Sequence, residues 1–464
     1  MVPADDGTVG RSASASAGAG APVAVLAGVH ADDAPLGTTI STGTGAPEPT
    51  RVPADRYTSP LFAALEAERL WPHVWQLACS VDHVAAPGDF FEHRVGPLSI
   101  LIVRGTDGEL RAFQNVCRHR GSALCDGSGA GLTEIRCPFH RWSWDLAGRL
   151  REVPSRKGFG VLRNDDYPLF PVAVDTWGPL VFVNASAAEP EPLAEFLEGV
   201  PDDVAWCGLD DFRCSYLVSL PVRCNWKTLI DAFSETYHVQ GIHREMLPMC
   251  DDVNSPQRLW TRHGKLTQPY GLPSPRLRQR PDDARVWASF IEIMGERIGI
   301  PGATPVDELP PVPEVPDGQT LRDVLAGMVV DLGTTNGLDL SGFTVDQLMS
   351  MEQYNLFPNI TVLVFPDIVS VIRARPGATV DDAVMDAFAL HRQPPGAPHA
   401  KPTDIELPTD TELPLGLVLN QDVGNFERAH RGMHQPGFTH LTLSNEECRI
   451  ANLHRELERF LDLG

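Results

Sequence analysis

Two short stretches of the chain each pair a cysteine with a histidine. They are Cys117-x-His119 and Cys137-x-x-His140, and the segment 120–136 separates them. Thiolates and imidazoles together can hold zinc, a mononuclear redox metal or an iron–sulfur cluster with mixed ligands. They can also pack together by chance, so the surrounding residues must decide between these possibilities.

The arrangement of the two pairs favours a Rieske-type [2Fe-2S] cluster. In such a cluster one iron binds two thiolates and the other binds two imidazoles, so two loops that each carry one ligand of each kind can reach both irons. Gly121, Gly127 and Gly131 permit close backbone approach, and Pro138 stiffens the second loop. Structural zinc sites more often take both cysteines from one turn and both histidines from a helix, and such a site is the alternative.

A second group of metal-binding residue types lies in 225–243, "NWKTLIDAFSETYHVQGIH". A helix predicted over 226–240 places Glu235 and His238 on one face. His243 lies about 140° further round that helix, so both imidazoles can bind one metal only if the helix bends or ends between them. Two histidines and one carboxylate leave open positions on Fe(II) for O2 and substrate. Ordinary polar side chains near a helix end are the alternative, and this segment alone does not identify the carboxylate.

The Cys-His pairs lie among predicted short strands. A stretch with helical spacing of apolar residues begins at Ser59-Pro60, a typical N-cap and first helical residue. Short alternating or apolar runs bounded by turn residues then predict strands near 89–95, 98–104, 108–116 and 180–186. We therefore expect a helix followed by a small all-β domain over 57–190, with the pairs at turns between strands.

The remaining part of the chain, 200–464, mixes strands and helices. Strands are predicted at 360–365, 369–374 and 383–392, and a C-terminal helix follows the capping-box residues Ser444 and Glu447. Nine prolines between Gly271 and Asp317 predict a covering loop without long regular elements. The fold class is therefore predicted to be α+β, with the histidine-rich segment in the second, larger domain.

The composition is that of an acidic globular protein. A chain of 464 residues, 42% of them hydrophobic, is long enough for two or three domains. Its 38 basic and 61 acidic residues give a net charge of −23, which disfavours binding to nucleic acid or to an anionic membrane surface. No uncharged apolar run approaches the ~18 to 20 residues needed to cross a bilayer. Nine cysteines, without a convincing secretory signal, predict free thiols in a cytoplasmic protein.

The N-terminal segment 1–56 has a different composition. It contains no aromatic residue before Tyr57, and Ala, Gly, Ser and Thr make up more than half of it. Such a segment buries too little apolar surface to offset the entropy lost when its backbone is ordered. We predict a disordered tail over 1–56.

From about Tyr57 onward the motifs resemble those of the catalytic α subunit of Rieske non-haem iron ring-hydroxylating oxygenases. "NVCRHRG…CPFHRW" is similar to the cluster signature of that family, "NWK…YHVQGIH" to its iron-binding helix, and "YNLFPNITVLV" to the strand before its pocket. The resemblance implies a Rieske domain ahead of a START-like (helix-grip) catalytic domain, with an antiparallel sheet and helices around a mononuclear iron. It also implies that Asp422, in "NQDVGNFERAHRG", completes the iron site with His238 and His243. Glu427 is the next candidate for that carboxylate.

Three positions depart from the family pattern. Arg141 stands where many members have glycine after the second cluster histidine, which changes the surface offered to an electron donor. Asp231-Ala232 replaces a frequent Glu-Asn pair, so an asparagine beside the iron is absent. Glu235 stands where many relatives have aspartate. The resemblance implies that this carboxylate links a cluster histidine of one subunit to an iron histidine of the next.

The activity implied by the resemblance is that of an oxidoreductase, a monooxygenase or dioxygenase that activates O2. Electrons from NAD(P)H would pass through a reductase, and through a ferredoxin where one is used, to the [2Fe-2S] cluster and then to mononuclear Fe(II) in the neighbouring subunit. The resemblance further implies a homotrimer, with a small β subunit as an option. A Rieske electron carrier and a zinc-stabilised structural module are the rival interpretations. Three, two or no irons per chain would separate the three possibilities.

The substrate is expected to be an aromatic or other apolar small molecule, with a quaternary amine as the alternative. Cis-dihydroxylation, monohydroxylation and oxidative demethylation all remain open. "EMLPMC", at 245–250, supplies soft apolar side chains that can line a pocket or simply form part of the core.

Overall fold

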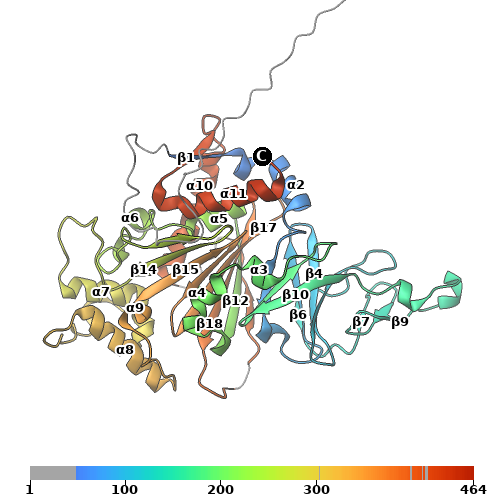
Figure 1. Ribbon diagram of the computed structural model, residues 1–464, viewed down its shortest axis with the longest axis horizontal. Coiled ribbons are helices and arrows are strands. Elements are labelled where there is room, and N and C mark those ends of the chain that lie inside the picture. The colour runs from blue at the N-terminus through green and yellow to red at the C-terminus, as the bar shows by residue number, and fades with distance from the viewer. Residues whose placement is uncertain (1–48, 303, 398–399, 410, 413–415, 464) are drawn as a thin grey trace, which may run out of the picture.

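Two β-sheets form the centre of the protein, one from each half of the chain (Figure 1). The computed structural model describes residues 49–302, 304–397, 400–409, 411–412 and 416–463. The first sheet contains β2 (Gln76–Ser80), β3 (Phe90–Val95), β4 (Leu98–Arg104), β5 (Leu110–Gln114), β6 (Ser128–Gly129), β10 (Pro171–Trp177) and β11 (Leu180–Asn184). Its order is β2-β11-β10-β5-β4-β3-β6, and every neighbouring pair is antiparallel.

The second sheet comes from the C-terminal half. It contains β12 (Phe212–Val222), β13 (Gln257–Leu259), β14 (Gly264–Pro269), β15 (Ser350–Leu356), β16 (Ile360–Val364), β17 (Ile368–Pro376), β18 (Ala383–Arg392) and β19 (Thr403–Glu406). Its order is β13-β14-β15-β16-β17-β18-β12-β19, antiparallel except for the parallel pair β12 and β19. This confirms the expected all-β domain followed by an α+β domain built on an antiparallel sheet.

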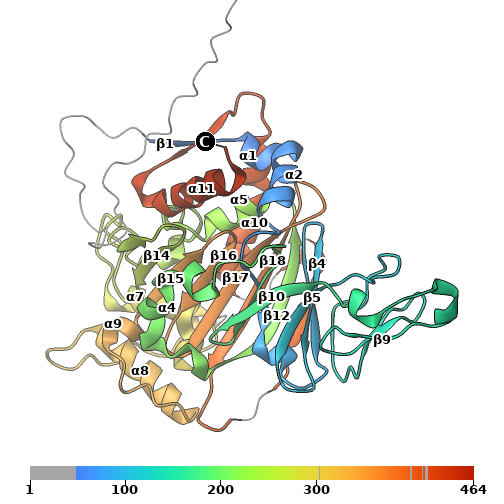
Figure 2. The same cartoon turned by 45° about the vertical axis from the view of Figure 1, so that its right-hand side comes forward.

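Two small sheets complete the strands. β7 (Ile135–Arg136), β8 (Ser143–Trp144) and β9 (Leu150–Glu152) form a three-stranded sheet that projects from one side of the molecule, away from the eight-stranded sheet (Figure 2). β1 (Thr50–Pro53) pairs with β20 (His440–Leu443) at the opposite end of the sequence.

The helices gather mainly in the C-terminal half. They are α1 (Asp55–Thr58), α2 (Pro60–Arg69), α3 (Leu193–Phe196), α4 (Val200–Val204), α5 (Trp226–Ala232), α6 (Val239–Ile242), α7 (Asp283–Met294), α8 (Leu321–Thr335), α9 (Val345–Leu348), α10 (Leu417–Met433) and α11 (Cys448–Leu461). α5, α10 and α11 lie together over one end of the eight-stranded sheet, and α7, α8 and α9 lie near its opposite end (Figures 1 and 2). No helix in the described ranges is long and apolar enough to cross a bilayer.

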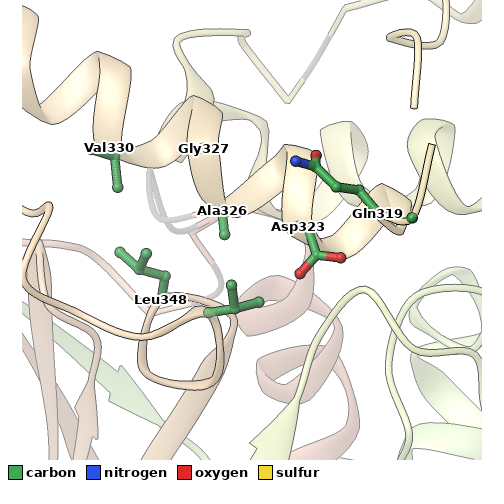
Figure 3. Close-up of a pocket in the computed structure, with 8 residues that line it drawn as sticks. Gln319, Asp323, Ala326, Gly327, Val330 and Leu348 are labelled. Atoms are coloured by element: carbon green, nitrogen blue, oxygen red, sulfur yellow. The ribbon is translucent and has the colours of Figure 1, made fainter. Parts of the chain in front are cut away.

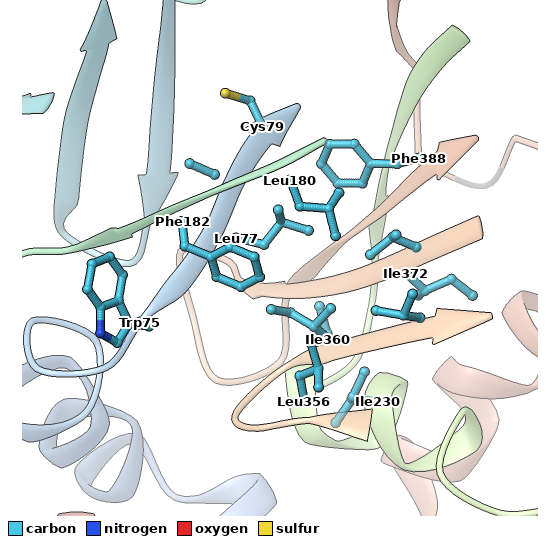
Figure 4. Packing of buried hydrophobic residues seen from close by; sticks show 14 of the residues in the cluster. Trp75, Leu77, Cys79, Leu180, Phe182, Ile230, Leu356, Ile360, Ile372 and Phe388 are labelled. Atoms are coloured by element: carbon cyan, nitrogen blue, oxygen red, sulfur yellow. The ribbon is translucent and has the colours of Figure 1, made fainter. Parts of the chain in front are cut away.

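One hydrophobic cluster joins the two halves. Leu77 and Phe182 from the seven-stranded sheet face Ile360 and Ile372 from the eight-stranded sheet, and all four are fully buried or nearly so (Figure 4). Because burial of each such side chain contributes about 1.5–3 kcal/mol, this shared core holds the halves in a defined relative position.

The predicted tail is too long at its C-terminal end. The segment 1–48 lies outside the described residues, but β1 is an ordered strand whose register pairs Val52 with Leu441. Val52, Tyr57 and Leu443 are buried in one small apolar cluster. The composition of 50–56 conceals this order because the pairing partner lies near the other end of the chain.

The N-terminal helix, predicted to belong with the all-β domain, packs instead against the C-terminal half. Glu66 of α2 accepts hydrogen bonds from the Lys227 ammonium and from Trp226 Nε1 of α5. Lys227 is 0% exposed, and a buried ammonium group is tolerated only with a carboxylate partner. This pairing therefore attaches α2 to α5.

The proline-rich stretch also differs from expectation. Its composition predicts no long regular element, yet the helix α7 lies within it. No proline falls between Pro281 and Pro301, and the Asp282 side chain accepts a hydrogen bond from the Arg285 N–H to cap the helix. Proline density averaged over the whole stretch hides this proline-free window.

Candidate metal centres

His238, His243 and Asp422 converge in the C-terminal half. Their potential ligand atoms all lie within 4.8 Å of one another. Asp422 Oδ1 is 3.1 Å from His243 Nε2 and 3.7 Å from His238 Nε2. His243 and Asp422 are almost completely buried, whereas the His238 side chain is 22% exposed. The structure thus brings together the three residues predicted to hold the mononuclear iron.

The predicted helix ends before either histidine, and the chain leaves the helical conformation again at His243, where φ is −114° and ψ is 48°. The helix expected over 226–240 ends at Ala232, and the single turn α6 follows after a gap, with His238 just before it and His243 just after it. The carbonyl of Phe233 accepts hydrogen bonds from Asn355 Nδ2 at 2.7 Å and Thr361 Oγ1 at 3.3 Å. Side chains from β15 and β16 thereby satisfy a carbonyl that a continuous helix would have used internally.

Asp422 comes from the buried face of α10. Asp422, Phe426 and His430 are the buried residues of this helix, and their spacing of four places them along one stripe. α10 packs on α5, so the stripe faces the segment that carries the two histidines. Glu427, the alternative carboxylate, is 49% exposed and pairs with Arg223 and Arg431 instead.

Each imidazole is oriented by a hydrogen bond on its far side. His238 Nδ1 donates to Glu235 Oε1 at 2.6 Å, and the other oxygen of Glu235 accepts from the His238 backbone N–H at 3.0 Å. His243 Nδ1 donates to Gln421 Oε1 at 2.6 Å. Since both acceptors hold the proton on Nδ1, the Nε2 lone pairs are free to bind a metal.

Gln421 contacts His243 in the candidate site, which the sequence did not indicate. Its amide nitrogen donates to the Glu245 carboxylate, which fixes the amide orientation so that the oxygen faces His243. The sequence shows that Gln421 directly precedes Asp422. A neighbouring amide is too common to indicate a role, so only the fold identifies its contact with His243.

The chemistry of this donor set suits Fe(II). Two neutral imidazoles and one carboxylate with open positions form the facial arrangement of non-haem iron oxygenases. Although burial acts to lower it, the hydrogen bond and negative charge of Glu235, together with Asp422, raise the pKa of His238. The local field therefore favours positive charge at this place, as a metal cation requires.

The two Cys-His loops have matching backbone geometry. The Cys117 and Cys137 N–H groups donate to Ser122 O and Trp142 O, each at 2.8 Å. Gly121 and Arg141, each four residues after its cysteine, both have a positive φ, 76° and 66°. Arg141 thus adopts a conformation that usually favours glycine, and its side chain is exposed.

The four side chains of these loops meet. His119 and His140 have ring centroids 4.7 Å apart, and Cys117 and Cys137 are buried close enough to hydrogen bond. Although burial acts to raise it, hydrogen bonds from the His140 and Phe139 backbone lower the pKa of Cys137. His119 Nδ1 is buried and has no hydrogen-bond partner within the described residues. An unpartnered imidazole nitrogen beside two thiols fits a [2Fe-2S] cluster with mixed ligands.

The two centres lie on different sides of the chain. The β7–β9 sheet, which flanks the second Cys-His loop, projects at one end, whereas α5 lies over the eight-stranded sheet, with the seven-stranded sheet between them (Figures 1 and 2). The Cys-His loops are surrounded by exposed apolar side chains, with Phe139 58%, Phe159 43% and Phe170 41% exposed.

Two other features lie largely outside these centres. The apolar residues of the "EMLPMC" stretch belong to the core, because Met246, Leu247, Met249 and Cys250 are buried in one cluster with residues of α7 and α8. Its first residue, Glu245, contacts the site through Gln421. An open pocket of about 450 Å³ lies between α8 and α9 (Figure 3). It is lined by residues such as Gln319, Asp323 and Val330, and none of the metal-site residues reaches it.

The chain matches two family models. Residues 74–171 match the Rieske [2Fe-2S] domain, and residues 209–463, more than half of the chain, match the ring hydroxylating alpha subunit (catalytic domain). Sequence relatives include the glycine betaine monooxygenase oxygenase subunit of Chromohalobacter salexigens, 31% identical over 44% of this chain and 46% of that protein. The carnitine monooxygenase oxygenase subunit of Escherichia coli is 30% identical over 48% of this chain and 59% of that protein. These matches span about half the length of the curated relatives.

Solved structures share the fold at low identity. The quaternary ammonium Rieske monooxygenase CntA in complex with L-carnitine has a TM-score of 0.62 and 16% identity, covering 89% of this chain and 96% of that one. Naphthalene 1,2-dioxygenase with indole bound has a TM-score of 0.61 and 16% identity, covering 89% and 92%. The family-model matches show that the chain belongs to the Rieske non-haem iron oxygenases, as an alpha subunit with a Rieske [2Fe-2S] cluster domain and a mononuclear iron domain.

Proposed function

We propose that this protein is the oxygenase component of a Rieske monooxygenase that hydroxylates a quaternary amine. In this proposal Cys117, His119, Cys137 and His140 hold the [2Fe-2S] cluster, and His238, His243 and Asp422 hold the mononuclear iron. The convergence of two imidazole Nε2 atoms on the Asp422 carboxylate carries the proposal. A Rieske electron carrier would have no need of such a site, and a zinc module would not combine it with the two Cys-His loops.

The reaction inserts one oxygen atom into a C–H bond and reduces the other to water. The overall balance is R–H, O2, two electrons and two protons in, with R–OH and water out. The electrons come from NAD(P)H through a partner reductase, with or without a ferredoxin. The mononuclear iron supplies the site at which O2 is activated. The protein residues hold that site: Glu235 and Gln421 keep both Nε2 lone pairs directed inward, and burial of His243 and Asp422 keeps bulk water from the ligands.

We further propose that electrons pass between subunits of a homotrimer. Within one chain the Cys-His loops and the α5–α6 region are separated by the seven-stranded sheet (Figure 1). Exposed apolar residues surround the loops, and Tyr237, beside His238, is 46% exposed. Exposed apolar patches of this kind are typical of protein–protein contacts. A neighbouring subunit could thus bring its cluster loops to this His238. A small β subunit remains a prediction.

Glu235→Gln should slow electron transfer between the centres while leaving both metals in place. The carboxylate holds His238 through two hydrogen bonds, and we propose that it also connects His238 to a cluster histidine of the facing subunit. The amide keeps the shape but loses the charge, and loss of such an outer contact typically costs about 10- to 100-fold. Stopped-flow reduction of the cluster followed by single-turnover product analysis measures this step.

The control for Glu235→Gln is that the metal content and the subunit assembly remain intact. Iron content, subunit association and the rate of cluster reduction should match the wild type. Near-wild-type product yield in both Glu235→Gln and Glu235→Ala, with iron intact, would show that this carboxylate has no part in electron transfer.

The substrate class rests on the relatives and on charge. The sequence relatives are named for glycine betaine, carnitine and choline, so the expected aromatic substrate finds no support among them. A net charge of −23 raises the local concentration of cations and disfavours anions. A cationic quaternary amine such as choline gains from this field, whereas a zwitterionic betaine or a neutral aromatic hydrocarbon gains little from it.

A substrate panel tests the proposed function directly. The iron-loaded protein, supplied with a reductase and NADH, should couple O2 consumption to product formation with at least one quaternary amine. Trimethylated amino alcohols, betaines and carnitine-like acids form one arm, and naphthalene, indole and benzoate form the other. Coupled turnover confined to the aromatic arm would contradict the proposed substrate class, and NADH oxidation without any product would contradict an oxygenase acting on either.

A further inference from the structure

Among the described residues, a second group of two histidines and one carboxylate lies outside the proposed iron site. His430 Nε2 and His434 Nε2 are both 2.8 Å from Asp381 Oδ1, and the two nitrogens are 3.4 Å apart. All three ligand atoms lie within 4.8 Å of one another, as they do for His238, His243 and Asp422. The proposed function uses none of these three residues.

The three residues come from two elements that the fold holds together. His430 and His434 are spaced i, i+4 at the C-terminal end of α10, where His434 is the helical C-cap. This spacing puts two imidazoles on one helix face and is a recurrent way of binding zinc. Asp381 lies in the turn between β17 and β18 and faces them. The ring centroids are 5.0 Å apart, the same separation as in the His238–His243 pair.

The geometry suits a divalent transition-metal ion. Tetrahedral zinc with bonds of ~2.0 Å places neighbouring ligand atoms about 3.3 Å apart, close to the 3.4 Å between the two nitrogens. The two nitrogen–oxygen separations of 2.8 Å are hydrogen-bond distances, which a bound ion would widen. The Asn225 N–H donates to His430 Nδ1 at 3.5 Å, and the Thr228 hydroxyl lies 3.4 Å from the same nitrogen. Binding of a metal at Nε2 therefore requires the imidazole proton to move to Nδ1, where the Thr228 hydroxyl can accept it.

The exposed side chains of this cluster give a metal ion a path into the site and leave one coordination position open to water. The His430 side chain is 4% exposed, whereas those of His434 and Asp381 are 38% and 52% exposed. One ligand is therefore anchored inside the protein and two face solvent, where water can occupy the remaining position. A bound ion would tie α10 to the β17–β18 turn and, through Thr228 and Asn225, to the start of α5.

We propose that Asp381, His430 and His434 form a binding site for a zinc-class divalent cation, separate from the mononuclear iron site. His430 lies two helical turns beyond Asp422 on the same buried stripe of α10, or about 12 Å along the helix axis. An ion there would stabilise the helix that carries Asp422 without touching the iron ligands. This inference does not depend on the proposed function or on the identity of the substrate.

Zinc uptake by protein already loaded with iron tests the site. The full chain, with both iron centres filled, is incubated with two equivalents of Zn²⁺, desalted and analysed for zinc and iron together. The wild type should retain one additional zinc per chain without losing iron. Asp381→Asn and His434→Ala should bind zinc at least about tenfold more weakly, since each removes a ligand. Zinc should also raise the Tm of the wild type, but not of the variants, by about 2 °C or more.

His440→Ala is the matched control, because this half-buried histidine contacts only the neighbouring Thr439 hydroxyl among the side-chain hydrogen bonds of the described residues. It should bind zinc like the wild type, and an unchanged cluster spectrum in every variant reports intact folding. Equal zinc uptake by the wild type and both site variants, or no uptake by the wild type, would overturn the proposal. Zinc gained together with an equal loss of iron would place it at the mononuclear site and would also overturn it.

Discussion

Asp422→Ala should abolish product formation and leave the colour and electron paramagnetic resonance spectrum of the cluster unchanged. Its carboxylate is the group on which both imidazole Nε2 atoms converge, and it is only 3% exposed. Without it two neutral imidazoles remain, too few ligands to retain Fe(II) at this place. The loss should therefore exceed the about 10- to 100-fold cost of removing an outer contact. His238→Ala and His243→Ala should behave in the same way.

Glu427→Ala is the control for this result. Glu427 lies further along the same helix, but is 49% exposed and pairs only with Arg223 and Arg431 in the surroundings given by the structure. Its removal should leave activity near the wild-type value. The measurements are iron content by elemental analysis and product yield under reducing conditions. Retained activity in Asp422→Ala together with loss in Glu427→Ala would reassign the carboxylate ligand.

Replacing a proposed ligand of the [2Fe-2S] cluster should abolish product formation as Asp422→Ala does, but through loss of the cluster. Cys117→Ser, Cys137→Ser, His119→Ala and His140→Ala should each bleach the brown protein and remove the Rieske resonance signal. Each side chain is one of the four proposed to hold the two irons, and the potential of a Rieske cluster, roughly −150 to +300 mV, depends on mixed thiolate and imidazole ligation. Product formation should fail as well, because no electrons reach the mononuclear site.

Cys125→Ser separates a ligand effect from a general effect of losing a thiol in this loop. Burial raises the pKa of Cys125 to about 11, so its sulfur is a neutral thiol, and it lies outside the two Cys-His pairs. This variant should keep the colour and the spectrum. A wild-type protein that is colourless and contains zinc in place of iron would contradict the cluster assignment altogether.

Local sequence determined much of the first half of the protein. The Cys-His loops need only short-range information, because each ligand pair sits in one tight turn and the two matching turns are close together in the chain. Strands β3, β4, β5 and β11 were predictable from short alternating or apolar runs, and β16, β17 and β18 followed from the same pattern. The Ser444–Glu447 capping box likewise marks the start of the last helical segment.

Tertiary structure decided the parts of the site that depend on distant partners. The helix predicted over 226–240 ends at Ala232, and the Phe233 carbonyl there accepts hydrogen bonds from Asn355 and Thr361 on strands far along the chain. Helical periodicity alone predicts a continuous helix there. Local helix propensity does not show that the Phe233 carbonyl will accept hydrogen bonds from strands elsewhere in the chain.

The carboxylate ligand of the proposed iron site was also not predictable from local sequence. The spacing of histidines on a short segment indicated a metal site, but Asp422, which is distant from His243 in the sequence, was identified through family resemblance and not from its own surroundings. Gln421, Asp381 and the attachment of α2 to α5 escaped prediction for the same reason. A hydrogen bond or ion pair between residues far apart in the chain leaves no periodic pattern, and only the packing of α10 and the two sheets brings such groups within bonding distance.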